Sequence, residues 1–172
     1  LRGKVQQRPT DADAWRTLGW AYMHVRQPAE AAEAYTHAVA IAPGNMDDRS
    51  ALVEATIQSG DGRISSQSVQ ELRAIEAKHP GDPRTRFYLA IYKDQQGDHK
   101  GAIADWIALL KSAPAGAGWA PEVRGVIEKV AQEEHIDISG QLPPSPAEAP
   151  AMPGPNAEQM AAAQQMSAGD RN

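Results

Sequence analysis

The stretch that decides the fold is WRTLGWAYMHVRQPAEAAEAYTHAVAIAPG, which runs from Trp15 to Gly44. Its first part places large and small residues on one helical stripe, which consists of Trp15, Leu18, Gly19 and Tyr22. Its second part places a facing stripe on another helix, which consists of Ala31, Tyr35 and Ala38. The small residues would lie where the two helices cross, and the large one would fill the gap between them. The stretch therefore predicts two closely packed helices, with Gly19 allowing the close approach.

Helix breakers recur along the chain at a nearly constant spacing. Pro9 and Pro43 lie 34 residues apart, as do Pro80 and Pro114, whereas Pro43 and Pro80 lie 37 residues apart. Alanine is abundant, and no stretch alternates apolar and polar residues as a strand would, so the chain reads as helical up to about residue 135. A 34-residue period in helical sequence is the signature of tetratricopeptide repeats (TPRs), in which each unit is a helix-turn-helix.

The repeats differ in how well they keep the pattern. The third repeat keeps it mainly in its second helix, where the three positions are Ala102, Trp106 and Leu109. The middle repeat is degenerate, and its three additional residues would form a turn within Ser59–Ser66. We therefore predict an all-α TPR helical solenoid with three helix-turn-helix repeats, at about residues 12–45, 46–82 and 83–116.

The end of the repeat array needs a cover, because a terminal repeat leaves an apolar face exposed. A capping helix is expected at residues 120–135, with an apolar stripe made of Val123, Val126, Ile127 and Val130. The domain would then span residues 1–138. Residues 139–172 are rich in proline and alanine, and they are expected to form a disordered tail with at most a short helix near Glu158–Met166.

The two tryptophans of the first helix are expected to have separate roles. Trp15 and Trp20 lie roughly 140° apart around a helix that turns about 100° per residue. Trp15 belongs to the core of the repeat, whereas Trp20 joins the stripe that lines the concave groove in TPR folds. An alternative is that Trp20 packs under residues 1–7, which would form a further helix.

The same stripe can be followed through the later repeats. An aromatic residue at each end with polar residues between them suits an amphipathic helix or an extended peptide. The candidate peptide-binding groove consists of Arg16, Trp20, Met23, His24, Glu54, Ile57, Gln58, Phe87, Ile91 and Gln95.

Composition argues against several other functions. The net charge of −5 would repel a phosphate backbone, so nucleic acid is not an expected partner. The chain has no cysteine, which removes disulfides and thiol catalysis. No catalytic, phosphate-binding or dinucleotide motif appears, so we expect neither an enzyme nor a cofactor. EEHID at Glu133–Asp137 could bind a cation weakly, but a solvated helix end is the favoured interpretation.

Three segments together resemble one particular family. They are RFYLAIYKDQQGDHKGAIADWIALLKSAP at residues 86–114, WAPEVRGVIE at residues 119–128, and GPNAEQMAAAQQMSAGDR at residues 154–171. With the lengthened middle turn, they look like the C-terminal domain of the CcmI family of cytochrome c biogenesis proteins, also called CycH. The resemblance covers nearly the whole chain.

The resemblance implies a function and a location. The function would be that of a chaperone that holds unfolded apocytochrome c, largely by the C-terminal helix of that client, and passes it to the haem-ligation complex. The location would be the periplasm, with a tether to the inner membrane through a transmembrane segment upstream of residue 1. The alternative is a TPR scaffold of another kind, which assembles folded proteins by its convex face.

Overall fold

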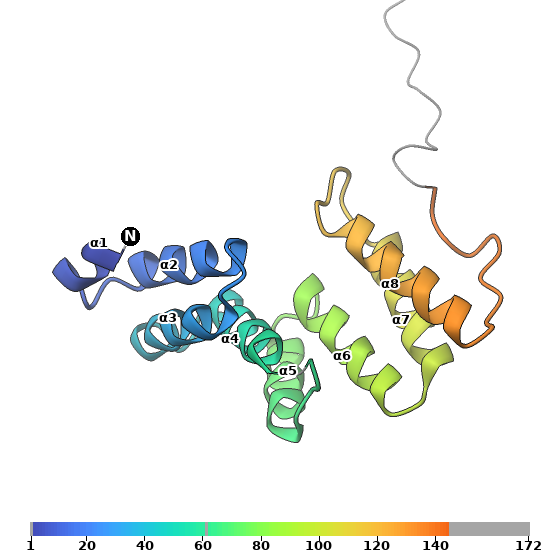
Figure 1. Ribbon diagram of the computed structural model, residues 1–172, viewed down its shortest axis with the longest axis horizontal. Helices are drawn as coiled ribbons and strands as arrows, with labels where there is room; N and C mark the ends of the chain where they lie inside the picture. Colours follow the sequence, from blue (N-terminus) through green and yellow to red (C-terminus); the bar gives the residue numbers. More distant parts are fainter. Residues whose placement is uncertain (1, 61, 145–172) are drawn as a thin grey trace, which may run out of the picture. The chain divides into compact units, whose positions relative to one another are not determined.

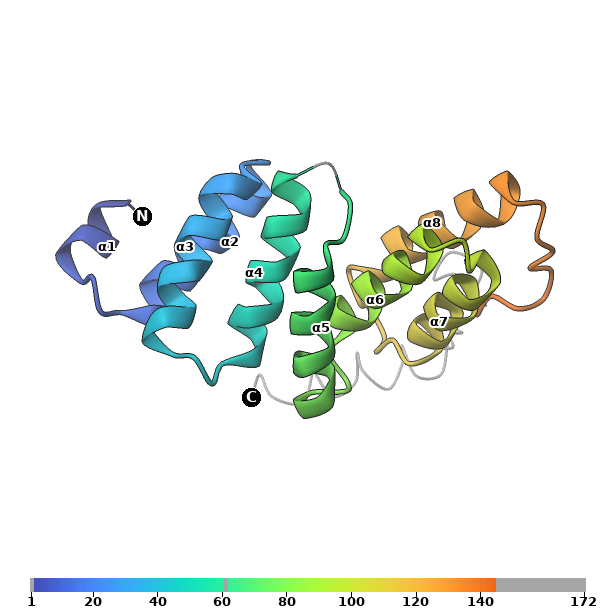
Figure 2. The same ribbon diagram turned by 90° about the horizontal axis from the view of Figure 1, so that it is seen from below.

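The computed structural model describes residues 2–60 and 62–144, and these residues contain helices and no strand. The helices are α1 (Arg2–Gln7), α2 (Ala12–His24), α3 (Pro28–Ile41), α4 (Met46–Ser59), α5 (Ser66–Lys78), α6 (Pro83–Gln95), α7 (His99–Lys111) and α8 (Ala120–Glu133). Helices α2 to α7 follow one another as three pairs, and α8 packs against α7 (Figures 1 and 2). The predicted all-α TPR architecture is confirmed, with α1 added at the N-terminal end.

The sequence marks the helix starts with side chains that cap the first backbone N–H groups. Each of these residues accepts a hydrogen bond from the N–H three positions ahead: Asp11, Asn45, Ser65, Asp82 and Asp98. Proline occupies the first turn of α3, α6 and α8, where its missing N–H costs nothing. Each repeat contains one or two of these caps. They fix where the helices begin, and these starts agree with the helix-turn-helix repeat that the proline spacing indicated.

The core of the first repeat contains Trp15, which lies half-buried against Leu18 and Ala34. Its ring stacks on the ring of His37 with centroids 4.1 Å apart, and its Nε1 donates to the carbonyl of Pro9 at 3.0 Å. Val5 of α1 is buried in the same cluster. The short helix α1 therefore packs on the Trp15 side of α2 and leaves Trp20 uncovered.

The degenerate middle repeat still builds a core of branched aliphatic residues. Leu72 and Ile75 of α5 are fully buried, and they share a cluster with Val53 and Ile57 of α4. Tyr88 of α6 completes this cluster, so the middle core joins α4 and α5 to the next repeat. Apolar volume at the right positions is thus sufficient for packing without the TPR consensus residues.

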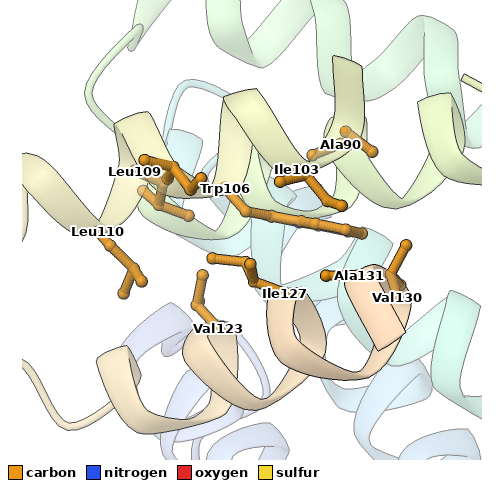
Figure 3. Close-up of a cluster of buried hydrophobic side chains, with 11 residues drawn as sticks. Ala90, Ile103, Trp106, Leu109, Leu110, Val123, Ile127, Val130 and Ala131 are labelled. Atoms are coloured by element: carbon orange, nitrogen blue, oxygen red, sulfur yellow. The ribbon is translucent and has the colours of Figure 1, made fainter. Parts of the chain in front are cut away.

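The largest apolar cluster lies between α6, α7 and α8 (Figure 3). Trp106 of α7 is 1% exposed, and its Nε1 donates to the carbonyl of Phe87 at 3.2 Å. Val123, Ile127 and Val130 of α8 face it, with Ile127 completely buried. Helix α8 thus covers the apolar face of α7.

The chain continues to pack after α8 ends. Ile136, Ile138 and Leu142 are half-buried against the cluster of α7 and α8, and Leu1–Leu142 forms one compact unit. The tail expected at residues 139–172 and its short helix near Glu158–Met166 fall mostly or wholly outside the described residues. Within the described residues, none of the helices has the length and apolar composition needed to cross a lipid bilayer.

Candidate peptide-binding surface

Arg16 joins α2 to α4 through a forked ion pair with Asp48. Its Nε and Nη2 donate to the two carboxylate oxygens of Asp48 at 2.5 and 2.8 Å, and Nη1 bonds Asp13. Asp48 is 1% exposed, and the hydrogen bond to it raises the pKa of Arg16. The guanidinium of Arg16 therefore already holds two helices together, and its remaining capacity to bind a ligand is small.

Arg84 performs the corresponding task between α4 and α6. Its Nη1 donates to the hydroxyl of Ser50 at 2.9 Å, and its Nε lies 2.5 Å from the carboxylate of Glu54. Ser50 is fully buried, so this contact fixes the position of Arg84 beside α4. Glu54, one of the predicted groove residues, thus lies on the surface with its charge already paired.

The hydroxyl of Tyr35 marks where these charged groups meet. Burial raises the pKa of Tyr35, and the charges of four side chains act on it: Arg84, Glu54, Asp48 and Arg16. Tyr35 comes from α3, whereas these side chains come from α2, α4 and α6. Charged side chains from the first helix of each repeat therefore act on one buried tyrosine of α3.

Two glutamines of the predicted groove also form contacts within the protein. Gln58 Nε2 donates to the hydroxyl of Tyr88 at 3.1 Å and to Glu54 at 3.2 Å. Gln95 accepts a hydrogen bond from the N–H of Ile64 at 3.0 Å and donates to the carbonyl of Gly62 at 2.9 Å. Gln95 thereby ties the turn between α4 and α5 to the end of α6.

Three predicted apolar residues lie deeper than expected. Ile57 is 5% exposed in the core of the middle repeat, so it belongs to the core rather than to a groove surface. Met23 and Ile91 are half-buried against apolar clusters. The reason is that neighbouring helices bury a wider arc of each first helix than the single core stripe read from the sequence.

Trp20 is the large apolar residue that remains on the surface of α2. It is 58% exposed, and its ring lies against the ring of His24 with centroids 3.8 Å apart. Nδ1 of His24 lies 3.0 Å from the carbonyl of Trp20. Because α1 packs elsewhere, the alternative in which residues 1–7 cover Trp20 is excluded, and Trp20 is free to contact another chain.

A pocket opens where α4, α6 and α8 come together. Its volume is about 190 Å³, and its lining consists of Glu54, Asp82, Pro83, Arg84, Phe87, Tyr88, Trp119, Glu122 and Val123. Burial raises the pKa of Tyr88 to about 12, in keeping with its enclosed position. Phe87 is half-buried and borders Tyr88 with centroids 5.3 Å apart.

Two residues of the predicted groove, Glu54 and Phe87, line this pocket, and the prediction did not include its other lining residues. Residues 120–135 were predicted to form a capping helix, and Trp119, which precedes them, was not included in the candidate groove. In the structure, α8 follows α7 as α4 follows α3 and α6 follows α5. A signal in the sequence that could have revealed the pocket is Trp119, which immediately precedes α8. This helix takes the place along the chain that the first helix of a fourth repeat would take.

Metal ligands do not gather in the part of the chain that the structure describes. Residues 2–60 and 62–144 contain no group of three or more His, Asp or Glu side chains placed to hold an ion. The surface instead offers an exposed indole on α2 and an aromatic pocket on α4, α6 and α8. Such features suit contact with another polypeptide.

These helix pairs define a TPR domain. Solved structures of the same kind include MamA, with a TM-score of 0.52, 18% identity and coverage of 78% of this chain and 84% of that chain. The Sgt2 TPR domain from Aspergillus fumigatus gives a TM-score of 0.53 at 19% identity, covering 86% of this chain and 93% of that chain. At these identities the likeness shows the fold alone.

The chain belongs to the family described as the cytochrome c-type biogenesis protein H TPR domain, which residues 1–118 match. The cytochrome c-type biogenesis protein CycH of Bradyrhizobium diazoefficiens is 27% identical over 167 residues, or 97% of this chain. The protein of the same name from Rhizobium meliloti is 32% identical over 169 residues, or 95% of this chain. The chain spans 41% and 40% of the lengths of these relatives. The family resemblance inferred from the sequence is confirmed.

Proposed function

We propose that this domain acts in cytochrome c maturation as a chaperone, which binds apocytochrome c through the C-terminal helix of that client. Membership of the cytochrome c-type biogenesis family supports the maturation step. The exposure of Trp20 carries the proposal of binding. Its indole ring is 58% exposed on the face of the first helix, and contact with water is unfavourable for an apolar ring, so a partner that covers the ring would gain binding free energy.

The chain would hold its client without a covalent bond. Apocytochrome c carries a C-x-x-C-H motif whose two thiols must stay reduced and available for haem attachment. This chain has no cysteine, so it cannot form a mixed disulfide with those thiols. Reversible binding through an apolar groove would protect the client and still permit its transfer to the haem-ligation complex.

We also propose that the domain lies in the periplasm and belongs to a protein anchored in the inner membrane. The matched relatives are much longer than this chain, which leaves room for an anchor in other parts of the protein. Fractionation of cells that produce the whole protein, followed by protease treatment of spheroplasts, tests this location. Protection of the domain from protease in intact spheroplasts would contradict it.

The binding proposal is tested with a labelled synthetic peptide that corresponds to the C-terminal helix of a c-type cytochrome. We expect the 172-residue chain to raise the fluorescence anisotropy of the peptide, and Trp20→Ala to weaken binding by about tenfold. Folded, haem-bearing cytochrome should bind much more weakly, because its C-terminal helix is already buried.

Two outcomes would contradict the proposal. No binding of the peptide at millimolar concentrations would remove the chaperone function. Equal affinity for the peptide and for folded cytochrome would favour the alternative, in which the domain is a scaffold for folded partners.

A further inference from the structure

The pocket between α4, α6 and α8 has the size and lining of a site for a single apolar side chain. Phe87, Tyr88, Trp119 and Val123 form its apolar wall, and its volume is about 190 Å³. A cavity of roughly 150 Å³ accommodates a benzene-sized group. One leucine, methionine or phenylalanine side chain from a partner would therefore fill the pocket.

Three of the charged side chains that line this pocket already have partners within the protein: Glu54, Arg84 and Asp82. Glu54 pairs with Arg84 at 2.5 Å. The carboxylate of Asp82 accepts hydrogen bonds from the N–H and the hydroxyl of Thr85, at 2.9 and 2.5 Å. These two acidic groups therefore have little capacity left for a ligand.

Glu122 is the remaining charge. It lies exposed in the first turn of α8, and within the described part of the chain its carboxylate has no hydrogen bond or ion pair. Glu122 lines the same pocket as Phe87, Tyr88 and Trp119, so its carboxylate borders the aromatic wall. A free negative charge thus borders an apolar pocket.

We infer that this pocket anchors the client helix by taking one large apolar side chain, while a Lys or Arg one helical turn away pairs with Glu122. The inference rests on the proposed function, since it concerns the same client and the same surface. Charge complementarity identifies the occupant as the basic, apolar side of an amphipathic helix. Residues three or four apart on a helix are neighbours at about 5–6 Å, so one turn carries both groups.

This assignment gives α8 a second role. The helix covers the apolar face of α7 through Val123, Ile127 and Val130. It also supplies Trp119 and Glu122 to the pocket. Val123 takes part in both roles, because it is buried in the cluster with α7 and also lines the pocket, whereas the exposed Glu122 belongs to the pocket side of the helix start.

The test uses the labelled client peptide and three variants of the 172-residue chain. We expect Glu122→Lys to weaken binding by about tenfold, since it replaces an attraction by a repulsion. Trp119→Ala removes part of the apolar wall and should weaken binding by at least about tenfold. The matched control is Glu76→Lys, which makes the same charge change at an exposed position of α5 outside the pocket and should leave the affinity within about twofold.

A charge exchange identifies the partner group. In a series of peptides, each Lys or Arg is changed to Glu one at a time. One of these peptides should bind the wild-type chain poorly and the Glu122→Lys chain well. Rescue of that single pair is a result that a merely structural effect on α8 would not produce.

The outcomes separate this inference from the proposed function. If the peptide binds and neither Glu122→Lys nor Trp119→Ala changes its affinity, the pocket is not the anchor site, although the chaperone function stands. If the peptide does not bind the wild-type chain, both fail. Should Trp119→Ala unfold the chain, Glu122→Lys and its charge exchange decide, because Glu122 is exposed and its replacement leaves the core intact.

Discussion

Gly19 of α2 lies directly against the ring of Tyr35 of α3. A Cβ atom on Gly19 would be 2.9 Å from both Cε1 and Cζ of that ring, closer than carbon atoms approach in folded proteins. Tyr35 is 5% exposed, so its ring is enclosed by neighbouring helices. The distance between the two helices of the first repeat thus depends on the absence of one methyl group.

Gly19→Ala should therefore destabilise the protein, although alanine is the better helix former. Alanine favours a helix interior by about 1 kcal/mol over glycine, whereas overpacking costs about 1–3 kcal/mol. We expect a net loss of about 1 kcal/mol in urea denaturation. Gly125→Ala in α8 is the matched control, because nothing lies within 4 Å of its added Cβ, and it should gain stability. Equal effects at both positions would refute the close-approach argument.

The tryptophans should rank in stability by their burial. Trp106→Ala removes a side chain that is 1% exposed and should cost about 3–5 kcal/mol. Trp15→Ala should cost less, because Trp15 is half-buried, and Trp20→Ala should cost about 0.5 kcal/mol or less. The midpoints of chemical denaturation measure all three. A large loss for Trp20→Ala would show that Trp20 is part of the core.

Removal of the Arg16 guanidinium should destabilise the fold, because it leaves the buried carboxylate of Asp48 unpaired. Arg16→Met leaves Asp48, which is 1% exposed, without its partner and should cost about 2 kcal/mol. The double variant Arg16→Met with Asp48→Leu should recover part of that loss, since no charge then remains buried. Arg8→Met is the control. Nη1 of Arg8 lies 3.9 Å from the carboxylate of Asp11 in a solvent-exposed pair, so its loss should change the free energy of unfolding by close to zero. A similar loss at both arginines would contradict this account.

His99 should make stability depend on pH. Its Nδ1 lies 2.6 Å from Asp94, which raises the pKa of His99, and Glu134 lies 3.7 Å from its Nε2. Because the folded state binds the proton more tightly, this contribution is complete below the unfolded pKa of about 6.5 and is lost as the pH rises through the folded value. The melting temperature of the wild-type chain should therefore fall, relative to His99→Gln, as the pH rises above about 6.5. Parallel melting curves for the two proteins would contradict the prediction.

The helical periodicity was sufficient to predict the repeats, because burial on a helix follows directly from the spacing of apolar residues. Tyr35, Ala38 and Trp106 lie in the core as the pattern indicated. What the pattern could not show was how far a neighbouring helix extends around each face, and for this reason Ile57 was assigned to the groove.

The sequence alone therefore established the helix pairs, the close contact at Gly19 and the family, since these depend on short-range spacing and on segment identity. Pairing of side chains across repeats depends on three-dimensional proximity, which no local pattern encodes. The contacts of Arg16 with Asp48 and of Arg84 with Glu54 became apparent once the helices were placed. The same is true of the pocket at Trp119, because its walls come from three helices that are distant in the chain.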